Sequence, residues 1–260
     1  MNYIFTKSHH RIMYKKLVVA CTILACIVKF WTLDNPFQLS DEVAFSTISE
    51  SAAQTLFDTL ANLDYIEFRY ANNHCEDRAH AMSYEIAEQG IVAGKAWIFV
   101  RGIFENTYPK VLKIHDANKI GKNNLLTWKY HVAPVVMSEQ GDTLVLDPSL
   151  CETPVTLKEW FHKMNVKEDV HWDEIFFLIK DWKYQSYVTR NKVPRLLETW
   201  KTDNNYYWTK KGLCEGRLCQ QFLDDNLEAP DSVRAKAKKF KELPKSYQKQ
   251  KKMCLQNFPF

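Results

Sequence analysis

One helix followed by closely spaced strands is the feature that most limits how this chain can fold. A helical pattern begins at Cys75 and ends at Gly90. Ala79, Met82 and Ile86 follow Cys75 at helical spacing, which predicts a buried face. Cys75 should therefore lie at the N-terminal tip of a helix that packs on the rest of the chain.

The strands expected after this helix cover residues 95–101, 128–136 and 143–147. Gly141 and Asp142 indicate a hairpin turn before the third strand, and Pro148 ends that strand. Because short links join strands in an antiparallel manner, the sequence predicts an α+β fold with an antiparallel sheet.

The segments around this region are less regular. Ser40 is a suitable N-cap for a helix running to about Leu63, and another helix should begin near Pro154. Residues 103–126 are polar and read as irregular, and residues 166–260 give no reliable assignment.

The N-terminus has the pattern of an export signal. Lys15 and Lys16 precede an apolar run from Leu17 to Val28. Twelve residues suit a signal-peptide core better than a membrane span, which needs ~20. An uncleaved anchor, which would keep the protein in contact with a membrane, is the alternative.

Charge is distributed unevenly over the 260 residues. Residues 1–29 carry +5 and residues 234–252 carry +8, so the total of +4 leaves −9 for residues 30–233. An acidic body does not suggest a nucleic-acid partner. The basic tail is interpreted as a solvated, partly helical end, and binding to phosphate or a membrane is the alternative.

Cys75 is placed where a nucleophile is useful. A helix N-terminus stabilises a thiolate, and its unpaired N–H groups can hold an oxyanion. Taken alone, Cys75 is equally well explained as a buried or disulfide-bonded cysteine.

His131 and Asp147 could complete a catalytic triad. Asp147, at the end of a strand, could accept the imidazole N–H and fix the ring tautomer. The ordinary alternatives are a core histidine and a turn-forming aspartate before proline. A Cys on a helix with His and Asp on successive strands is the order of papain-like and transglutaminase-like sites.

Three blocks carry a more specific signal. They are Cys-Glu-Asp-Arg-Ala-His-Ala-Met (75–82), Trp-Lys-Tyr-His-Val-Ala (128–133) and Leu-Asp-Pro-Ser-Leu (146–150) followed by Pro-Val-Thr (154–156). Together they resemble the motifs of the protein-glutaminases, secreted bacterial enzymes that deamidate glutamine within proteins. The resemblance covers roughly residues 70–160 and implies Cys75 as nucleophile, His131 as general base and Asp147 as orienting acid.

The resemblance also implies a fold and a reaction. The fold would be α+β, with a transglutaminase-like (papain-like) core, an antiparallel sheet and the nucleophile at a helix N-terminus. Cys75 would form a thioester with a glutamine side chain, release ammonia and yield glutamate, with no metal or organic cofactor. The partners would be proteins or peptides with accessible glutamine, and we expect a monomer. Trp128 could line the substrate cleft, or it could belong to the core.

These expectations divide the chain into three segments: 1–33 as signal peptide or signal anchor, 34–165 as protein-glutaminase-like catalytic core, and 166–260 as a C-terminal extension with a basic tail. Three other functions stay open: a transglutaminase, a cysteine protease, and a catalytically silent binding protein of the same fold.

Two further expectations concern single residues. His80, which lies off the Cys75 face of the helix, should face solvent or pack locally. With the signal removed and Cys75 reserved for catalysis, Cys151, Cys214, Cys219 and Cys254 can pair in three ways. We prefer the Cys214–Cys219 pairing, which closes a short loop.

Overall fold

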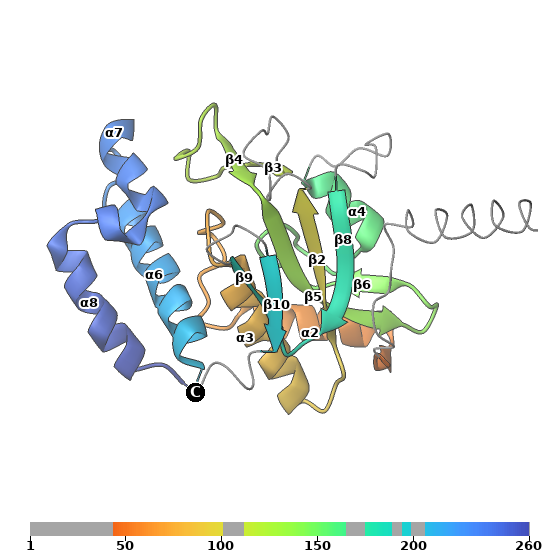
Figure 1. The fold of residues 1–260 in the computed structure, drawn as a ribbon. Helices are drawn as coiled ribbons and strands as arrows, with labels where there is room; N and C mark the ends of the chain where they lie inside the picture. The colour runs from red at the N-terminus through yellow and green to blue at the C-terminus, as the bar shows by residue number, and fades with distance from the viewer. Residues whose placement is uncertain (1–43, 101–111, 165–174, 189–193, 199–205, 260) are drawn as a thin grey trace, which may run out of the picture. The chain divides into compact units, whose positions relative to one another are not determined.

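The computed structural model describes residues 44–100, 112–164, 175–188, 194–198 and 206–259 (Figure 1). The predicted signal segment lies outside these residues. Leu39–Phe260 forms one compact unit. None of the helices in the described ranges combines the length and apolar character needed to cross a membrane. The boundary predicted between 165 and 166 stays a prediction.

A mainly antiparallel sheet forms the centre of this unit. Its strands, in spatial order, are β7 (Val155–Thr156), β6 (Thr143–Val145), β5 (Tyr130–Ser138), β2 (Gly94–Val100) and β8 (Ile175–Asp181), and β1 (Thr47–Ile48) runs parallel beside β5. Two hairpins, β3 (Leu112–His115) with β4 (Leu125–Trp128) and β9 (Tyr184–Val188) with β10 (Pro194–Glu198), lie outside the sheet. The predicted α+β class with an antiparallel sheet is confirmed.

Strand β2 is the centre of the core. All seven of its residues are buried, as expected for a strand that pairs on both edges and is covered on both faces. Even Lys95 is buried, and its Nζ lies 2.7 Å from His80 Nδ1 and donates to the carbonyl of Tyr184 at 2.9 Å. His80 is therefore a packing residue, and the solvent-facing alternative is wrong.

Helix α3 (Cys75–Glu88) has the predicted boundaries. Gln89 is its C-cap, and Gly90 follows in the left-handed region with φ +75°, which glycine adopts without strain. The helix is buried on more than the one predicted face, because its residues 77–83 are all buried.

Helix α2 (Glu50–Ala61) begins later than predicted. Ser49, and not Ser40, is its N-cap and accepts from the N–H of Ala52. The preceding residues Thr47 and Ile48 are not helical. They form the short strand β1, which pairs with β5.

Two strand predictions are also corrected. The single strand predicted for 128–136 is two strands, separated at Lys129, whose carbonyl accepts from the N–H of Val100. Part of the region read as irregular forms the β3–β4 hairpin, and β3 alternates buried and exposed residues as an edge hairpin does. The helix predicted near Pro154 is α4 (Leu157–Lys163), whose Thr156–Glu159 capping box sets its start.

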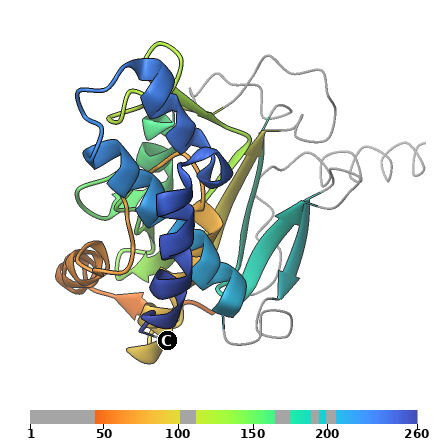
Figure 2. The same cartoon turned by 90° about the vertical axis from the view of Figure 1, so that its left-hand side faces the viewer.

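The C-terminal region is mainly helical. It contains α6 (Tyr207–Asp224), α7 (Asp231–Arg234), η4 (Ala235–Lys238), η5 (Phe240–Glu242) and α8 (Lys245–Gln256). Helices α6 and α8 lie side by side (Figures 1 and 2). The basic tail is packed and not merely solvated, because Ala237 and Leu243 are buried within it.

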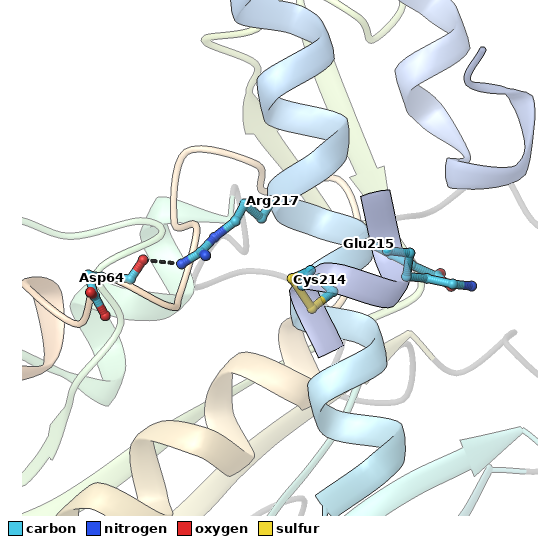
Figure 3. Close-up of a disulfide and its surroundings, with 6 residues drawn as sticks. Asp64, Cys214, Glu215 and Arg217 are labelled. Carbon is cyan, nitrogen blue, oxygen red and sulfur yellow. Dashed lines mark hydrogen bonds and ion pairs between the residues drawn. A yellow bond between two sulfur atoms is a disulfide. The ribbon is translucent and has the colours of Figure 1, made fainter. Parts of the chain in front are cut away.

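A disulfide joins α6 to α8 (Figure 3). It links Cys214 to Cys254, with the two Cα atoms 5.9 Å apart. The predicted Cys214–Cys219 pairing is wrong because both residues lie on α6, where five residues span ~7.5 Å along the axis, beyond the reach of a disulfide. Cys151 and Cys219 are buried free thiols.

The disulfide should contribute strongly to stability. It closes a separation of 40 residues, so Cys254→Ser should lower the free energy of unfolding by about 2–4 kcal/mol. Urea unfolding measures this change. Reductant should destabilise the wild type to the same extent and leave Cys254→Ser unaffected; equal midpoints for oxidised wild type and variant would contradict the assignment.

Candidate active site

The loop before α3 sets the position of Cys75. His74, the N-cap residue, adopts the left-handed conformation with φ 65°. The buried guanidinium of Arg78 donates to the carbonyls of Tyr70 at 2.9 Å and Asn73 at 2.8 Å. The turn that brings the chain to Cys75 is thus fastened to the helix that Cys75 begins.

Helix α6 supports this turn from the C-terminal region. His74 Nδ1 and Asp77 Oδ2 are 3.0 Å apart. A Cβ atom built on Gly212 would lie 1.8 Å from Asp77 Oδ2, and one built on Gly216 would lie 3.7 Å from the His74 ring. Glycine at 212 therefore lets the α6 backbone approach the tip of α3 so closely that any Cβ there would collide with Asp77 unless that side chain moved.

His131 and Asp147 form a buried pair. His131 Nε2 lies 2.7 Å from Asp147 Oδ2, which also accepts from the indole N–H of Trp160 at 2.8 Å. The N–H of Ser149 donates to the other carboxylate oxygen at 3.2 Å. Burial acts to raise the pKa of Asp147, but the charge and hydrogen bond of His131, with the Trp160 bond, outweigh it and hold the pKa below its ordinary value.

This pairing determines the tautomer of His131. A carboxylate can only accept, so Nε2 carries a proton, and whenever the ring is neutral Nδ1 presents a lone pair. Nδ1 is buried and has no hydrogen-bond partner within the described ranges. The ring is held in place by Trp128, which stacks on it with centroids 4.3 Å apart and planes at 16°.

The nearest polar partner of Cys75 is Glu76 and not His131. Its Sγ lies 3.4 Å from Glu76 Oε2 and is not hydrogen-bonded to His131 in this arrangement. Burial raises the pKa of the Cys75 thiol well above its ordinary value, and the Glu76 carboxylate adds to the effect. The resting side chain is therefore a protonated thiol that needs a base.

A cleft of about 680 Å³ opens in front of Cys75. The loop before α3 and the junction of β4 with β5 line it, and so do residues of α6, η5 and α8. Trp128 is largely buried and also lines the cleft, and its contact with substrate stays a prediction. In the part of the chain that the structure describes, no cluster of three or more His, Cys, Asp or Glu side chains could hold a metal ion.

Sequence reasoning predicted Cys75, His131 and Asp147 as site residues, which stays a prediction, but gave no indication of the residues that hold them. Trp160 lies just after the last motif block, where a buried aromatic in a helix gives no sign of a hydrogen bond to Asp147. Gly212 lies in a helix interior, where glycine is ordinarily unfavourable. A glycine at this unfavourable position was the one sequence signal that α6 packs closely against another part of the chain.

Comparison with known proteins gives one family match. Residues 53–164 match a family model described as glutaminase. No curated protein sequence matches the chain.

Solved structures give weaker likenesses. A crystal structure of protein-glutaminase matches with 20% identity and a TM-score of 0.46, over 65% of this chain and 89% of that one. The NMR structure of protein-glutaminase from Chryseobacterium proteolyticum matches with 19% identity and a TM-score of 0.47, over 67% and 89%. A crystal structure of pro-protein-glutaminase matches with 20% identity and a TM-score of 0.47, over 68% and 60%.

Gly212 and Gly216 provide a matched pair of substitutions on α6. Gly212→Ala should destabilise the protein by about 1–3 kcal/mol and change the reactivity of Cys75, because the methyl group would collide with Asp77. Gly216→Ala should be neutral or stabilising by about 0.5–1 kcal/mol, since its contacts would be ordinary and alanine favours helix. Thermal unfolding and iodoacetamide labelling measure both; equal tolerance at the two positions would refute the close contact.

Glu76 should control the acidity of Cys75. Glu76→Gln keeps the side-chain shape and removes the charge, so the pKa of Cys75 should fall and its alkylation profile should move to lower pH. Cys151 and Cys219 should react slowly, because burial raises the pKa of each to about 12. Glu88→Gln, an exposed change on the same helix, is the control. An unchanged profile for Glu76→Gln would contradict this effect.

Proposed function

We propose that this chain, whose residues 53–164 match a glutaminase family model, converts protein-bound glutamine to glutamate through a thioester on Cys75. The family match supports a glutamine-deamidating hydrolase. The thiol nucleophile, the triad and the protein-bound substrate are the proposed parts. The observation that carries them is the buried His131–Asp147 pair, whose Nδ1 has no hydrogen-bond partner among the described residues.

Proton transfer to His131 begins the proposed reaction. The raised pKa of Cys75 favours transfer during attack over a resting thiolate–imidazolium pair. Cys75 would rotate its side chain from Glu76 towards His131 Nδ1. Hydrogen bonds between catalytic groups are often long in unliganded sites and shorten when substrate binds. Asp147 would hold the ring through Nε2 and stabilise the imidazolium as it forms.

Sulfur attack and ammonia release follow. Sγ bonds to the carboxamide carbon, and the oxyanion would lie near N–H groups of the first turn of α3. The imidazolium then protonates the amine as the carbon–nitrogen bond breaks. Water, deprotonated by His131, attacks the thioester; the carbon–oxygen bond forms, the carbon–sulfur bond breaks, and glutamate and the thiol result.

Two secondary parts of the proposal concern substrate and location. Trp128 would contact the bound side chain, supported by its place at the cleft and its stacking on His131. Export from the cytoplasm is supported by the apolar run after Lys16 and by the Cys214–Cys254 disulfide, since disulfides persist in oxidising compartments. We further propose that the exported protein is a monomer.

Cys75→Ala should abolish ammonia release from a glutamine-containing protein without unfolding the chain. Asp147→Asn should lower kcat by roughly 10²–10⁴, because the imidazole would lose its correct tautomer. Cys219→Ala, which removes a buried thiol outside the cleft, is the control and should retain activity.

The products decide between the remaining functions. Deamidation adds about 1 Da at glutamine when –OH replaces –NH₂. Isopeptide products with a lysine-rich protein would indicate a transglutaminase, and a cleaved backbone would indicate a protease. No turnover of any kind would leave a binding protein of the same fold.

A further inference from the structure

Five lysines line the cleft in front of Cys75, and we call them the lysine wall: Lys129, Lys211, Lys239, Lys241 and Lys251. Lys129 joins β4 to β5, Lys211 lies on α6, Lys239 and Lys241 lie at η5, and Lys251 lies on α8. The cleft lining contains only two carboxylates, Glu76 and Glu215.

Three of the five lysines in the wall have no carboxylate partner among the described residues. Lys251 pairs with Glu215 at 3.1 Å, and Lys239 pairs with the exposed Glu242 at 3.1 Å. Within the described ranges, Lys129, Lys211 and Lys241 form no ion pair with a carboxylate. The cleft is thus positive although residues 30–233 carry a net charge of −9.

The backbone under the wall is well held. The side chain of Gln248 donates to the carbonyls of Lys241 at 3.0 Å and Leu243 at 2.7 Å, which fastens η5 to α8. The disulfide fastens α8 to α6, the two helices that carry Lys251 and Lys211 (Figures 2 and 3). The lysines are therefore presented by fixed elements and not by a loose tail.

We propose that the lysine wall binds acidic residues that flank the target glutamine, so that the protein acts preferentially on glutamines in acidic segments. This inference rests on the proposed function for the reaction and adds the substrate class. Charges of one sign inside a cleft attract the opposite charge more effectively than scattered surface charges do. The wall lines the same concave cleft as Cys75, which suits a peptide segment better than a membrane surface.

The preference should be visible in turnover and sensitive to salt. Single exposed ion pairs contribute little, so three uncompensated lysines should change kcat/KM by roughly threefold to thirtyfold between acidic and basic flanking residues. The difference should shrink as salt rises from about 20 to 500 mM, because salt screens such charges.

The test compares peptides of equal length with one glutamine flanked by Glu, Ser or Lys. Wild type should release ammonia fastest from the Glu peptide and slowest from the Lys peptide. The double variant Lys211→Glu, Lys241→Glu should lose or reverse this order while treating the Ser peptide nearly as wild type does. Lys249→Glu with Lys252→Glu makes the same charge change at exposed residues outside the cleft lining and should keep the order.

Binding to Cys75→Ala protein gives a second readout that needs no turnover. Fluorescence anisotropy should show tighter binding of the Glu peptide, lost in the Lys211→Glu, Lys241→Glu background. Lysine-dependent binding without turnover would remove the proposed reaction and keep this surface. Equal binding of Glu and Ser peptides would overturn the inference whatever the turnover. Lysine-dependent binding to phosphatidylserine vesicles, with no preference among peptides, would also overturn it.

Discussion

Close contact between α6 and the N-terminal tip of α3 is the constraint on which the rest of the structure depends. Gly212 allows the α6 backbone to reach Asp77, and Asp77 pairs with His74 immediately before Cys75. The family match ends at residue 164, yet α6 begins at Tyr207. A segment outside the match therefore completes the surroundings of the proposed nucleophile.

The resting site keeps nucleophile and base in separate environments. Cys75 is a protonated thiol beside Glu76, while the His131 ring is held by Asp147, Trp128 and Trp160. A thiol with a raised pKa is a weak nucleophile until a base removes its proton. In the proposed reaction the substrate enters the open cleft, and rotation of the Cys75 side chain towards His131 activates the thiol.

The sequence predicted the parts of the fold that local pattern determines. Helix α3 was predicted correctly because its periodicity, its first residue and Gly90 agree, whereas the strand predicted for 143–147 ends at Val145, two residues before Asp147. The interruption at Lys129 was missed, since an apolar run reads as one strand until pairing with β2 and β3 divides it. The Cys214–Cys254 link and the lysine wall depend on contacts between distant segments. Sequence alone left three cysteine pairings open, favoured the wrong one, and indicated a solvated tail.

The most direct test of the central claim is to detect the acyl-enzyme. Wild-type protein is mixed with a glutamine peptide, quenched in acid within milliseconds to seconds, digested and examined by mass spectrometry. The account predicts an adduct on Cys75 whose added mass equals the peptide mass less ammonia, about 17 Da, and which forms before glutamate accumulates. Glutamate that accumulates with no such adduct at any quench time, or an adduct on a different residue, would contradict the account.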